Sequence, residues 1–375
     1  MSNPFTIERL STQAAFCDRQ DELTTFERYA EDNLKVVLFS PRRFGKTSLL
    51  LRVQDRLMKK GFVCAYADFS TVTTVRGVAE EIMQGLFSAL HRKESLLEKG
   101  TRYLRVLTTF KPIVKISETG YKLTVAPDTN LDDITLFRQT VKELAAFVTN
   151  HDVRCCFIMD EFQELTRLRE TAELEGILRS NIQGVPASFF FLGSRRSVLL
   201  AMFNDKKRPF FKLARNEELA PLPEDDVVVF LQEQFTQAGK TIPEDIARRI
   251  AMHSRGHAYY MQYVAQELFY MADTEATLKD LERAEEAVLA KEQYGFAGII
   301  QGLPLQQLRL LKTLAQQKEG KLTSARFIGR SEMAASTIVD AQHKLLEQDL
   351  IEKDASGAYR VVDPFLARWL TGVDR

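Results

Sequence analysis

The segment from Ser40 to Thr47 constrains the fold of this chain more than any other feature. It reads Ser-Pro-Arg-Arg-Phe-Gly-Lys-Thr, and it follows the apolar run Lys35 to Phe39 and opens an amphipathic stretch. The segment fits the pattern G-x-x-x-x-G-K-[ST], except that Ser40 takes the place of the first glycine. In that pattern, the backbone N–H groups of the loop and of the following helix converge on a phosphate group. The segment therefore predicts a strand, a phosphate-binding loop and a helix, in that order.

The side chains of this segment suit a nucleotide bound together with Mg²⁺. Lys46 is expected to neutralise the β/γ oxygens, and the Thr47 hydroxyl is expected to ligate the metal. Serine at position 40 is small enough to keep the turn, provided that its φ angle stays negative. We therefore expect ATP or ADP with Mg²⁺ as the ligand. The residues expected to contact it are Ser40, Pro41, Arg42, Arg43, Phe44, Gly45, Lys46, Thr47 and Ser48.

A second candidate element is the apolar run Cys155 to Met159, which ends in Asp160 and Glu161. Asp160, at the carboxyl end of a predicted strand, would hold Mg²⁺ through water. Glu161 would polarise the attacking water as a general base. Taken alone, such a pair is often only a solvated loop. Its distance from the phosphate-binding segment favours the catalytic interpretation.

The next apolar run, Phe189 to Leu192, is followed by Gly193, Ser194 and Arg195. A polar residue at this strand end can sense the γ-phosphate, and an arginine there can stabilise the transferring charge. Ser194 is thus a candidate for nucleotide binding and Arg195 for catalysis. The alternative is that Arg195 and its neighbour Arg196 cap a surface helix.

A fourth element, Ser254 to Tyr260, interrupts a helical zone. Gly256 allows a tight junction between two helices. Arg255 or His257 is a candidate to reach the nucleotide from these helices. A purely structural role is the alternative for both side chains, and it is the commoner one at such a junction.

Three zones follow one another along the chain. In residues 1–222, short apolar runs alternate with amphipathic helical stretches, which predicts a parallel sheet covered on both faces. Alternation near residues 110–127 suggests an inserted β-hairpin. Residues 223–293 show a helical pattern throughout. Residues 294–375 give helix, short helix, helix and a strand pair, which is the order of a winged helix.

Two serines are expected to begin helices in this last zone. Ser324, next to Thr323, would cap the short helix, and Ser331 would cap the stretch Met333 to Gln348. Ser356 and Gly357 would form the turn between the two strands.

Composition excludes several classes of protein. The chain has 375 residues, with 51 lysines and arginines against 51 aspartates and glutamates, so its net charge is zero. This length predicts two or three domains, and the balance excludes a strongly basic coat for nucleic acid. With 45% hydrophobic and 27% charged residues, the composition is that of a globular protein.

The four cysteines and the N-terminus point to the cytoplasm. Cys17, Cys64, Cys155 and Cys156 form no C-x-x-C pair, and they are expected to be buried as small hydrophobic residues. The segment Met1 to Phe16 lacks the pattern of a signal peptide. No apolar stretch reaches the roughly 18 residues of a membrane span. We expect a cytoplasmic protein that does not insert into a membrane.

Four motifs together resemble those of the archaeal-type ATPases, which belong to the AAA+-like STAND NTPases and have close bacterial relatives. The motifs are P-R-R-x-G-K-T-S-L, h-h-h-D-E-[FL]-Q, h-h-h-x-[ST]-R and G-H-x-x-Y-x-Q, where h is an apolar residue. They occur at residues 41–49, 158–163, 189–195 and 256–262. The opening, with Asn3 to Phe5, and the ending, with Tyr359 to Phe365, also resemble that family.

The resemblance covers nearly the whole chain and implies an ASCE-type P-loop NTPase core, a helical lid and a C-terminal winged helix. The expected boundaries are 1–222, 223–293 and 294–375. In this family the nucleotide state is expected to set the arrangement of lid and winged helix. The sequence departs from the family at Ser40 and at Ala258, where relatives often carry proline.

Three functions fit these features, and each makes the chain an ATP-binding protein. The favoured one is a slow Mg²⁺-dependent ATPase that acts as a nucleotide-controlled switch and repositions the winged helix. The second is a DNA-acting ATPase resembling the replication initiators. The third is an ATP-gated module that binds a protein partner through the winged helix. For any of the three, a change between monomer and oligomer with the nucleotide is a further expectation. The sequence leaves open whether Arg42, Arg43, Arg195 or Arg196 acts on its own nucleotide or on a neighbour's.

Overall fold

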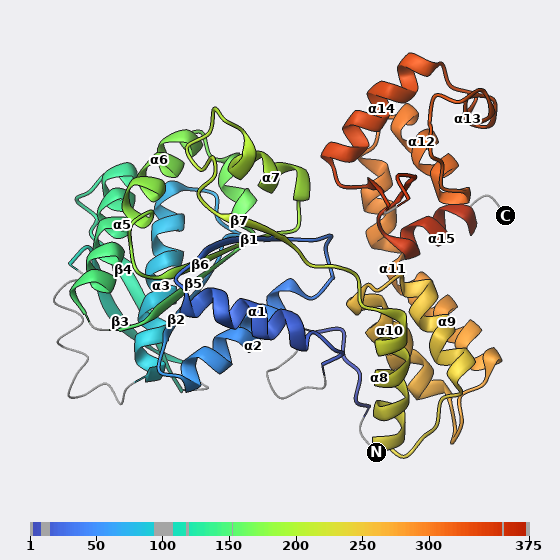
Figure 1. The fold of residues 1–375 in the computed structure, drawn as a ribbon, viewed down its shortest axis with the longest axis horizontal. Helices are drawn as coiled ribbons and strands as arrows, with labels where there is room; N and C mark the ends of the chain where they lie inside the picture. The colour runs from blue at the N-terminus through green and yellow to red at the C-terminus, as the bar shows by residue number, and fades with distance from the viewer. Residues whose placement is uncertain are drawn as a thin grey trace. The chain divides into compact units, whose positions relative to one another are not determined.

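The computed structural model describes residues 3–8, 16–93, 108–117, 120–151, 153–354 and 356–372. The chain separates into two compact units, which we describe one at a time (Figure 1). The sheet unit comprises Arg19–Ser40 and Lys46–Leu219, and the helical unit comprises Met1–Asp18, Pro41–Gly45 and Ala220–Arg375. The segment Ser40 to Thr47 is thus divided, because five of its residues belong to the helical unit.

A five-stranded sheet forms the centre of the sheet unit, with strand order β2-β5-β6-β1-β7. All neighbouring strands run parallel. Because they are parallel, their carboxyl ends lie at one edge, where ligands bind in open sheets of this kind. The strands are β1 (Lys35–Phe39), β2 (Val63–Asp68), β5 (Cys155–Asp160), β6 (Ser188–Gly193) and β7 (Arg215–Glu218).

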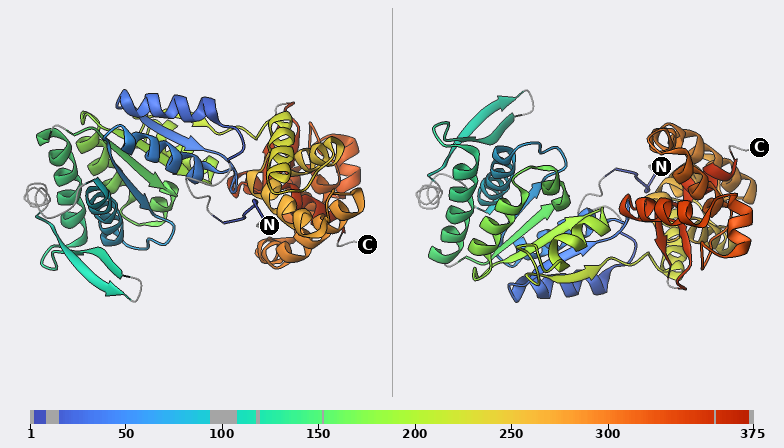
Figure 2. Two further views of the ribbon diagram at one scale, coloured as in Figure 1. Left: turned by 90° about the horizontal axis from the view of Figure 1, so that it is seen from below. Right: turned by 90° about the horizontal axis from the view of Figure 1, so that it is seen from above.

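Helices cover both faces of this sheet, as its apolar strands require (Figure 2). Alternate strand residues such as Val37 and Phe191 join a core built with α3, α5, α6 and α7. On the opposite face Phe26 of α1 packs edge-on against Phe190. The helices are α1 (Gln20–Glu31), α2 (Lys46–Lys59), α3 (Val75–Lys93), α5 (Asp133–Asn150), η1 (Phe162–Arg167, a 3₁₀ helix), α6 (Thr171–Ile182) and α7 (Arg196–Asn204).

The expected hairpin is present in the sheet unit. Strands β3 (Phe110–Ser117) and β4 (Gly120–Pro127) form a separate antiparallel pair, in which Phe110 lies opposite Pro127. The segment before β7 that contains Phe203 and Phe210 lies in the core. Both side chains are fully buried, and their rings stack with centroids 4.9 Å apart.

The helical unit begins with four helices, which are α8 (Glu224–Gln237), α9 (Glu244–Ser254), α10 (Ala258–Met271) and α11 (Leu278–Gln301). They are followed by α12 (Leu305–Gln316), α13 (Ala325–Ser331), α14 (Ala335–Glu347), β8 (Ile351–Lys353), β9 (Tyr359–Val361) and α15 (Pro364–Gly372). One apolar core runs through both sets, and Phe296 of α11 packs against Trp369 of α15. The lid-like helices and the winged helix are therefore packed as a single body.

Local capping agrees with the sequence at one serine and not at the other. The Ser324 side chain accepts a hydrogen bond from Phe327 N, so it caps α13 as expected. The predicted cap at Ser331 is wrong, because this residue ends α13 and its hydroxyl donates to the Ile328 carbonyl. Glu332, with φ of 52°, terminates the helix, and α14 begins only at Ala335.

The four cysteines are buried, as the sequence predicts, and none of them forms a disulfide among the described residues. Among the described residues, no helix combines the length and the apolar character needed to cross a lipid bilayer.

Candidate functional site

Ser40 follows β1 and Lys46 opens α2, and the two side chains meet. The Lys46 ammonium donates to the Ser40 carbonyl oxygen over 2.8 Å and to the Ser40 hydroxyl over 3.1 Å. Both residues are buried. A buried ammonium needs oxygen partners, and serine supplies one that glycine lacks. Ser40 is not among the described residues with positive φ, so the turn forms without a glycine there.

Two residues of the segment adopt the left-handed conformation. Arg43 has φ of 69° and Gly45 has φ of 91°. Glycine reaches this region without strain, which explains its place immediately before Lys46. A Cβ atom added at Gly45 would lie 3.8 Å from Cβ of Ala258, so space is available but the backbone conformation is not.

Thr47 and Asp160, which are 113 residues apart, lie side by side at the carboxyl edge of the sheet. The Thr47 hydroxyl donates to Asp160 Oδ2 over 2.7 Å. The Tyr66 hydroxyl, from β2, donates to the same oxygen over 2.8 Å. Asp160 Oδ1 accepts from the Glu161 backbone N–H over 2.9 Å. Three elements therefore fix this carboxylate, and sequence reasoning missed the contribution of Tyr66.

The pair Thr47 and Asp160 fits the requirements of Mg²⁺. Hydroxyl and carboxylate oxygens are its preferred ligands, and it is usually held by one or two protein groups together with substrate phosphates and water. In the part of the chain that the structure describes, no group of three or more histidines, cysteines, aspartates or glutamates is suited to a metal ion.

Glu161 lies beside Ser194, as the strand order brings β5 and β6 together. The Ser194 hydroxyl donates to Glu161 Oε2 over 2.9 Å. Gln163, from the same turn as Glu161, donates its side-chain N–H to the same oxygen. Glu161 itself has φ of 50°, a left-handed conformation that non-glycine residues seldom adopt. Sequence reasoning missed Gln163, although the signal was present in the run Asp-Glu-Phe-Gln.

Neither predicted arginine of this element forms an ion pair with Asp160 or Glu161 among the described contacts. Arg195 is the N-cap residue of α7 and is half-buried. Its side chain has no hydrogen bond among the described contacts. Arg196 pairs with Glu218 over 2.9 Å and lies over the ring of Phe39. The structure thus gives Arg196 a structural role, and it leaves Arg195 as a candidate.

Within the helical unit, Arg43 lies in a cage of aromatic and acidic side chains. Its guanidinium stacks over the ring of Tyr259 at 4.1 Å, donates to the Tyr260 hydroxyl over 3.0 Å, and pairs with Glu292 over 2.7 Å. Its carbonyl oxygen accepts from the Tyr259 backbone N–H over 3.2 Å. The start of α10 therefore holds both the backbone and the side chain of this loop residue.

The hydrogen bonds around Arg43 extend to the last helix, α15. The Tyr260 hydroxyl donates to Asp363 over 2.6 Å, and Asp363 accepts from the backbone N–H groups of Phe365 and Leu366 at the start of α15. Burial, followed by the charge of Asp363, raises the pKa of Tyr260, so the hydroxyl stays protonated and can donate. The Tyr260 ring also stacks on Phe365, with centroids 4.4 Å apart.

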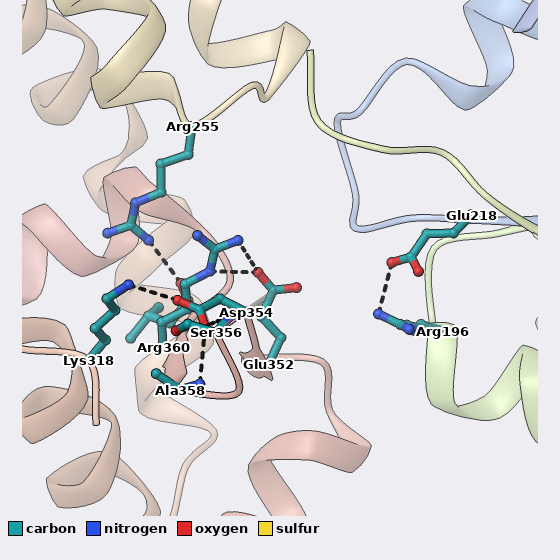
Figure 3. Close-up of polar contacts among 10 residues, drawn as sticks. Arg196, Glu218, Arg255, Lys318, Glu352, Asp354, Ser356, Ala358 and Arg360 are labelled. Carbon is teal, nitrogen blue, oxygen red and sulfur yellow. Dashed lines mark hydrogen bonds and ion pairs between the residues drawn. The ribbon is translucent and has the colours of Figure 1, made fainter. Parts of the chain in front are cut away.

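His257 lies under the loop, with the ring of Phe44 4.3 Å away. Burial, together with the charges of Arg255 and Arg360, lowers the pKa of His257 to about 3. The imidazole is therefore neutral at physiological pH. Its Nδ1 atom is buried without a hydrogen-bond partner among the described residues. The neighbouring Arg255 donates to the Val361 carbonyl oxygen over 3.2 Å (Figure 3).

The other predicted contact residues belong to the same segment or follow it directly. Arg42 is exposed, and Pro41 and Ser48 are half-buried.

Comparisons with known proteins agree with this architecture. A family model described as a probable winged helix domain matches residues 294–372. No curated protein sequence matches. The Walker-type ATPase PABY2304 of Pyrococcus abyssi superposes with a TM-score of 0.73 at 17% identity, over 98% of this chain and 99% of that one. The ORC2 protein of Aeropyrum pernix, solved in ADPNP–ADP complexes, superposes with a TM-score of 0.59 at 13% identity, over 98% and 96%.

At these identities the similarity establishes the fold. The chain has an α/β fold of the P-loop ATPase type, with a parallel central sheet, and it ends in a winged helix. This confirms the fold class predicted from the sequence.

Proposed function

We propose that the chain binds ATP with Mg²⁺ through Ser40 to Thr47, hydrolyses it slowly, and acts as a nucleotide-controlled switch that repositions its winged helix. We also propose that the chain is a member of the archaeal-type ATPases of the STAND class and that it acts in the cytoplasm. Lys46, Thr47 and Asp160 supply the charge and the oxygen ligands that a Mg²⁺-bound triphosphate needs.

The chemistry is a hydrolysis in which water attacks the γ-phosphorus and the bond to the ADP oxygen breaks, giving ADP and phosphate. Glu161 accepts a proton from the water, and Ser194 contacts the γ-phosphate. Mg²⁺, when bound by Thr47 and Asp160, neutralises charge on the phosphate oxygens. Arg195 is the arginine available to stabilise the transferring group from this strand.

One observation carries the switch proposal. The phosphate-binding segment is shared by both units, because Lys46 and Thr47 belong to the sheet unit whereas Pro41 to Gly45 belong to the helical unit. Arg43 is tied through Tyr260 to Asp363 and so to the start of α15. A change at Arg43 between ATP and ADP would therefore alter contacts within the helical unit.

The physics sets a condition on such a switch. A ligand shifts a conformational equilibrium only by the difference between its affinities for the two states. Slow hydrolysis suits this role, because each nucleotide state must last long enough to act on a partner. His257, neutral and next to Phe44, is the candidate nucleotide contact from the helical unit.

Hydrogen exchange in β9 and α15 tests the switch. We expect exchange rates to differ between Mg–ADP and a non-hydrolysable Mg–ATP analogue in the wild type. Arg43→Ala should abolish the difference while both nucleotides still bind. Arg249→Ala, at an exposed position of α9, is the matched control and should keep the difference. Identical exchange in both nucleotide states of the wild type would contradict the switch.

The second candidate function, a DNA-acting ATPase, is supported by the winged helix. Its charge distribution gives less support. From Phe296 onward the chain has eleven basic and nine acidic residues. Such a small excess gives little affinity for a phosphate backbone.

Four basic side chains of the winged helix also have polar partners. Arg360 pairs with Glu352 over 2.8 Å, and Lys318 pairs with Asp354 over 2.9 Å (Figure 3). Arg326 and Arg330 donate to Gln317, over 3.4 and 2.9 Å. A DNA phosphate would have to compete with these contacts. A protein partner for the winged helix is therefore the better supported extension of the switch.

A further inference from the structure

Gln163 is a fully buried amide beside the carboxylate to which we assign the role of general base. Its side-chain nitrogen donates to Glu161 Oε2, the oxygen that also accepts from Ser194. It lies 3.4 Å from a second carboxylate oxygen, Glu164 Oε1. Its own carbonyl oxygen is buried without a hydrogen-bond partner among the described residues.

This unpaired oxygen identifies what the amide does. A buried acceptor without a partner costs stability, and an apolar side chain of the same size would avoid that cost. Turning the amide by 180° would point its oxygen at two carboxylates and leave its N–H groups unpaired. The amide is therefore oriented by its hydrogen bond to Glu161, and this orientation leaves its carbonyl oxygen without a hydrogen-bond partner among the described residues.

Gly193 provides the space for this arrangement. A Cβ atom at Gly193 would lie 2.2 Å from Gln163 Oε1 and 3.0 Å from Leu199 Cδ2. Both are ends of flexible side chains, so an added methyl group would displace the Gln163 amide and leave the backbone of β6 in place. The glycine that precedes Ser194 is thus a partner of Gln163.

We propose that Gln163 is a positioning residue for ATP hydrolysis, which holds the Glu161 carboxylate by one oxygen and leaves the other oxygen for the attacking water. The proposal rests on the function proposed above. The hydrogen bonds of the Gln163 amide are to Glu161 and Glu164, neither of which is among the residues expected to bind ATP. Its effect should therefore appear in turnover and not in nucleotide affinity.

Gln163→Met tests this, because methionine keeps the length and the apolar volume and removes the N–H donor. We expect kcat to fall about 10- to 100-fold, the range found when an orienting partner of a site residue is lost, with KM changed less than about twofold. Gln54→Met is the matched control. It removes another buried amide of the same unit, whose N–H donates to the Cys64 carbonyl, and it should leave kcat within about twofold of the wild type.

A double variant separates positioning from a general loss of structure. If Gln163 acts through Glu161, then adding Gln163→Met to Glu161→Gln should lower the remaining rate by less than about twofold, since residues that act as a unit are not additive. Gly193→Ala should lower kcat as Gln163→Met does, and it should add nothing once Gln163 is alanine. Full additivity in either pair would overturn the positioning role.

The outcomes also separate this inference from the proposed function. If the wild type releases phosphate and Gln163→Met matches it, the positioning role fails and the ATPase proposal stands. If the wild type binds Mg–ATP without releasing phosphate, both proposals fail, because Glu161 then has no reaction to assist.

Discussion

The hydroxyl of Tyr260 donates a 2.6 Å hydrogen bond to the carboxylate of Asp363, 103 residues further along the chain. The same hydroxyl accepts from Arg43 of the segment Ser40 to Thr47. Asp363 in turn accepts from two backbone N–H groups of the first turn of α15. A single phenol thus joins the loop to the last helix.

Tyr260→Phe should destabilise the protein by about 1–3 kcal/mol, because a buried carboxylate loses its side-chain donor. The free energy of unfolding in urea and the amide protection of α15 would measure this. Tyr294→Phe removes a hydroxyl from a tyrosine that is 81% exposed, and it should change stability by less than about 0.5 kcal/mol. Equal effects of the two substitutions would show that the Tyr260–Asp363 bond contributes nothing.

Acid should destabilise the protein through His257. Its folded pKa of about 3 lies below the ordinary value of 6.5, so between these values the unfolded chain binds the extra proton. The stabilisation contributed by the neutral His257 is therefore fully present above pH 6.5. It falls by up to about 1.4 kcal/mol per pH unit below that value and is lost as the pH reaches 3. His257→Phe, which cannot titrate, should flatten this slope when the unfolding free energy is measured from pH 4 to 7. The same slope in both proteins would contradict the assignment.

Metal dependence should follow the Thr47 hydroxyl. Thr47→Val keeps the shape and removes the oxygen, so the Mg²⁺ concentration needed for half-maximal phosphate release should rise about 10- to 100-fold. Thr47→Ser should restore the wild-type value. An unchanged Mg²⁺ requirement in Thr47→Val would remove Thr47 from the metal site.

Duplex DNA should bind weakly and leave turnover within about twofold, since Lys318 and Arg360 of the winged helix are paired with acidic residues. Phosphate release with and without DNA at 50 and 200 mM salt would measure this. A several-fold stimulation by DNA would make the initiator-like function the better account.

The sequence predicted those parts of the site that depend on strand ends. Asp160 and Ser194 each follow an apolar run, and parallel strands necessarily bring such ends to one edge of the sheet. The helix–helix–hairpin order of the winged helix was equally readable, because its apolar periodicity is strong.

The parts that escaped prediction depend on tertiary contacts. The strand β7 reads Arg-Asn-Glu-Glu, which has no strand propensity, and it forms only because β1 offers a free edge for pairing. Tyr66 occupies an ordinary strand position, and its hydroxyl matters only because β2 and β5 pair in register at Asp68 and Asp160. The Ser331 cap failed because a left-handed residue ended the preceding helix first.

The central claim is that Ser40 to Thr47 binds Mg–ATP and that Glu161 serves its hydrolysis. We would measure ATP binding and steady-state phosphate release for the wild type, Lys46→Ala and Glu161→Gln. The account predicts that Lys46→Ala loses binding, whereas Glu161→Gln keeps binding and loses at least about 100-fold in phosphate release. A wild-type protein that binds no nucleotide in the presence of Mg²⁺ would contradict it.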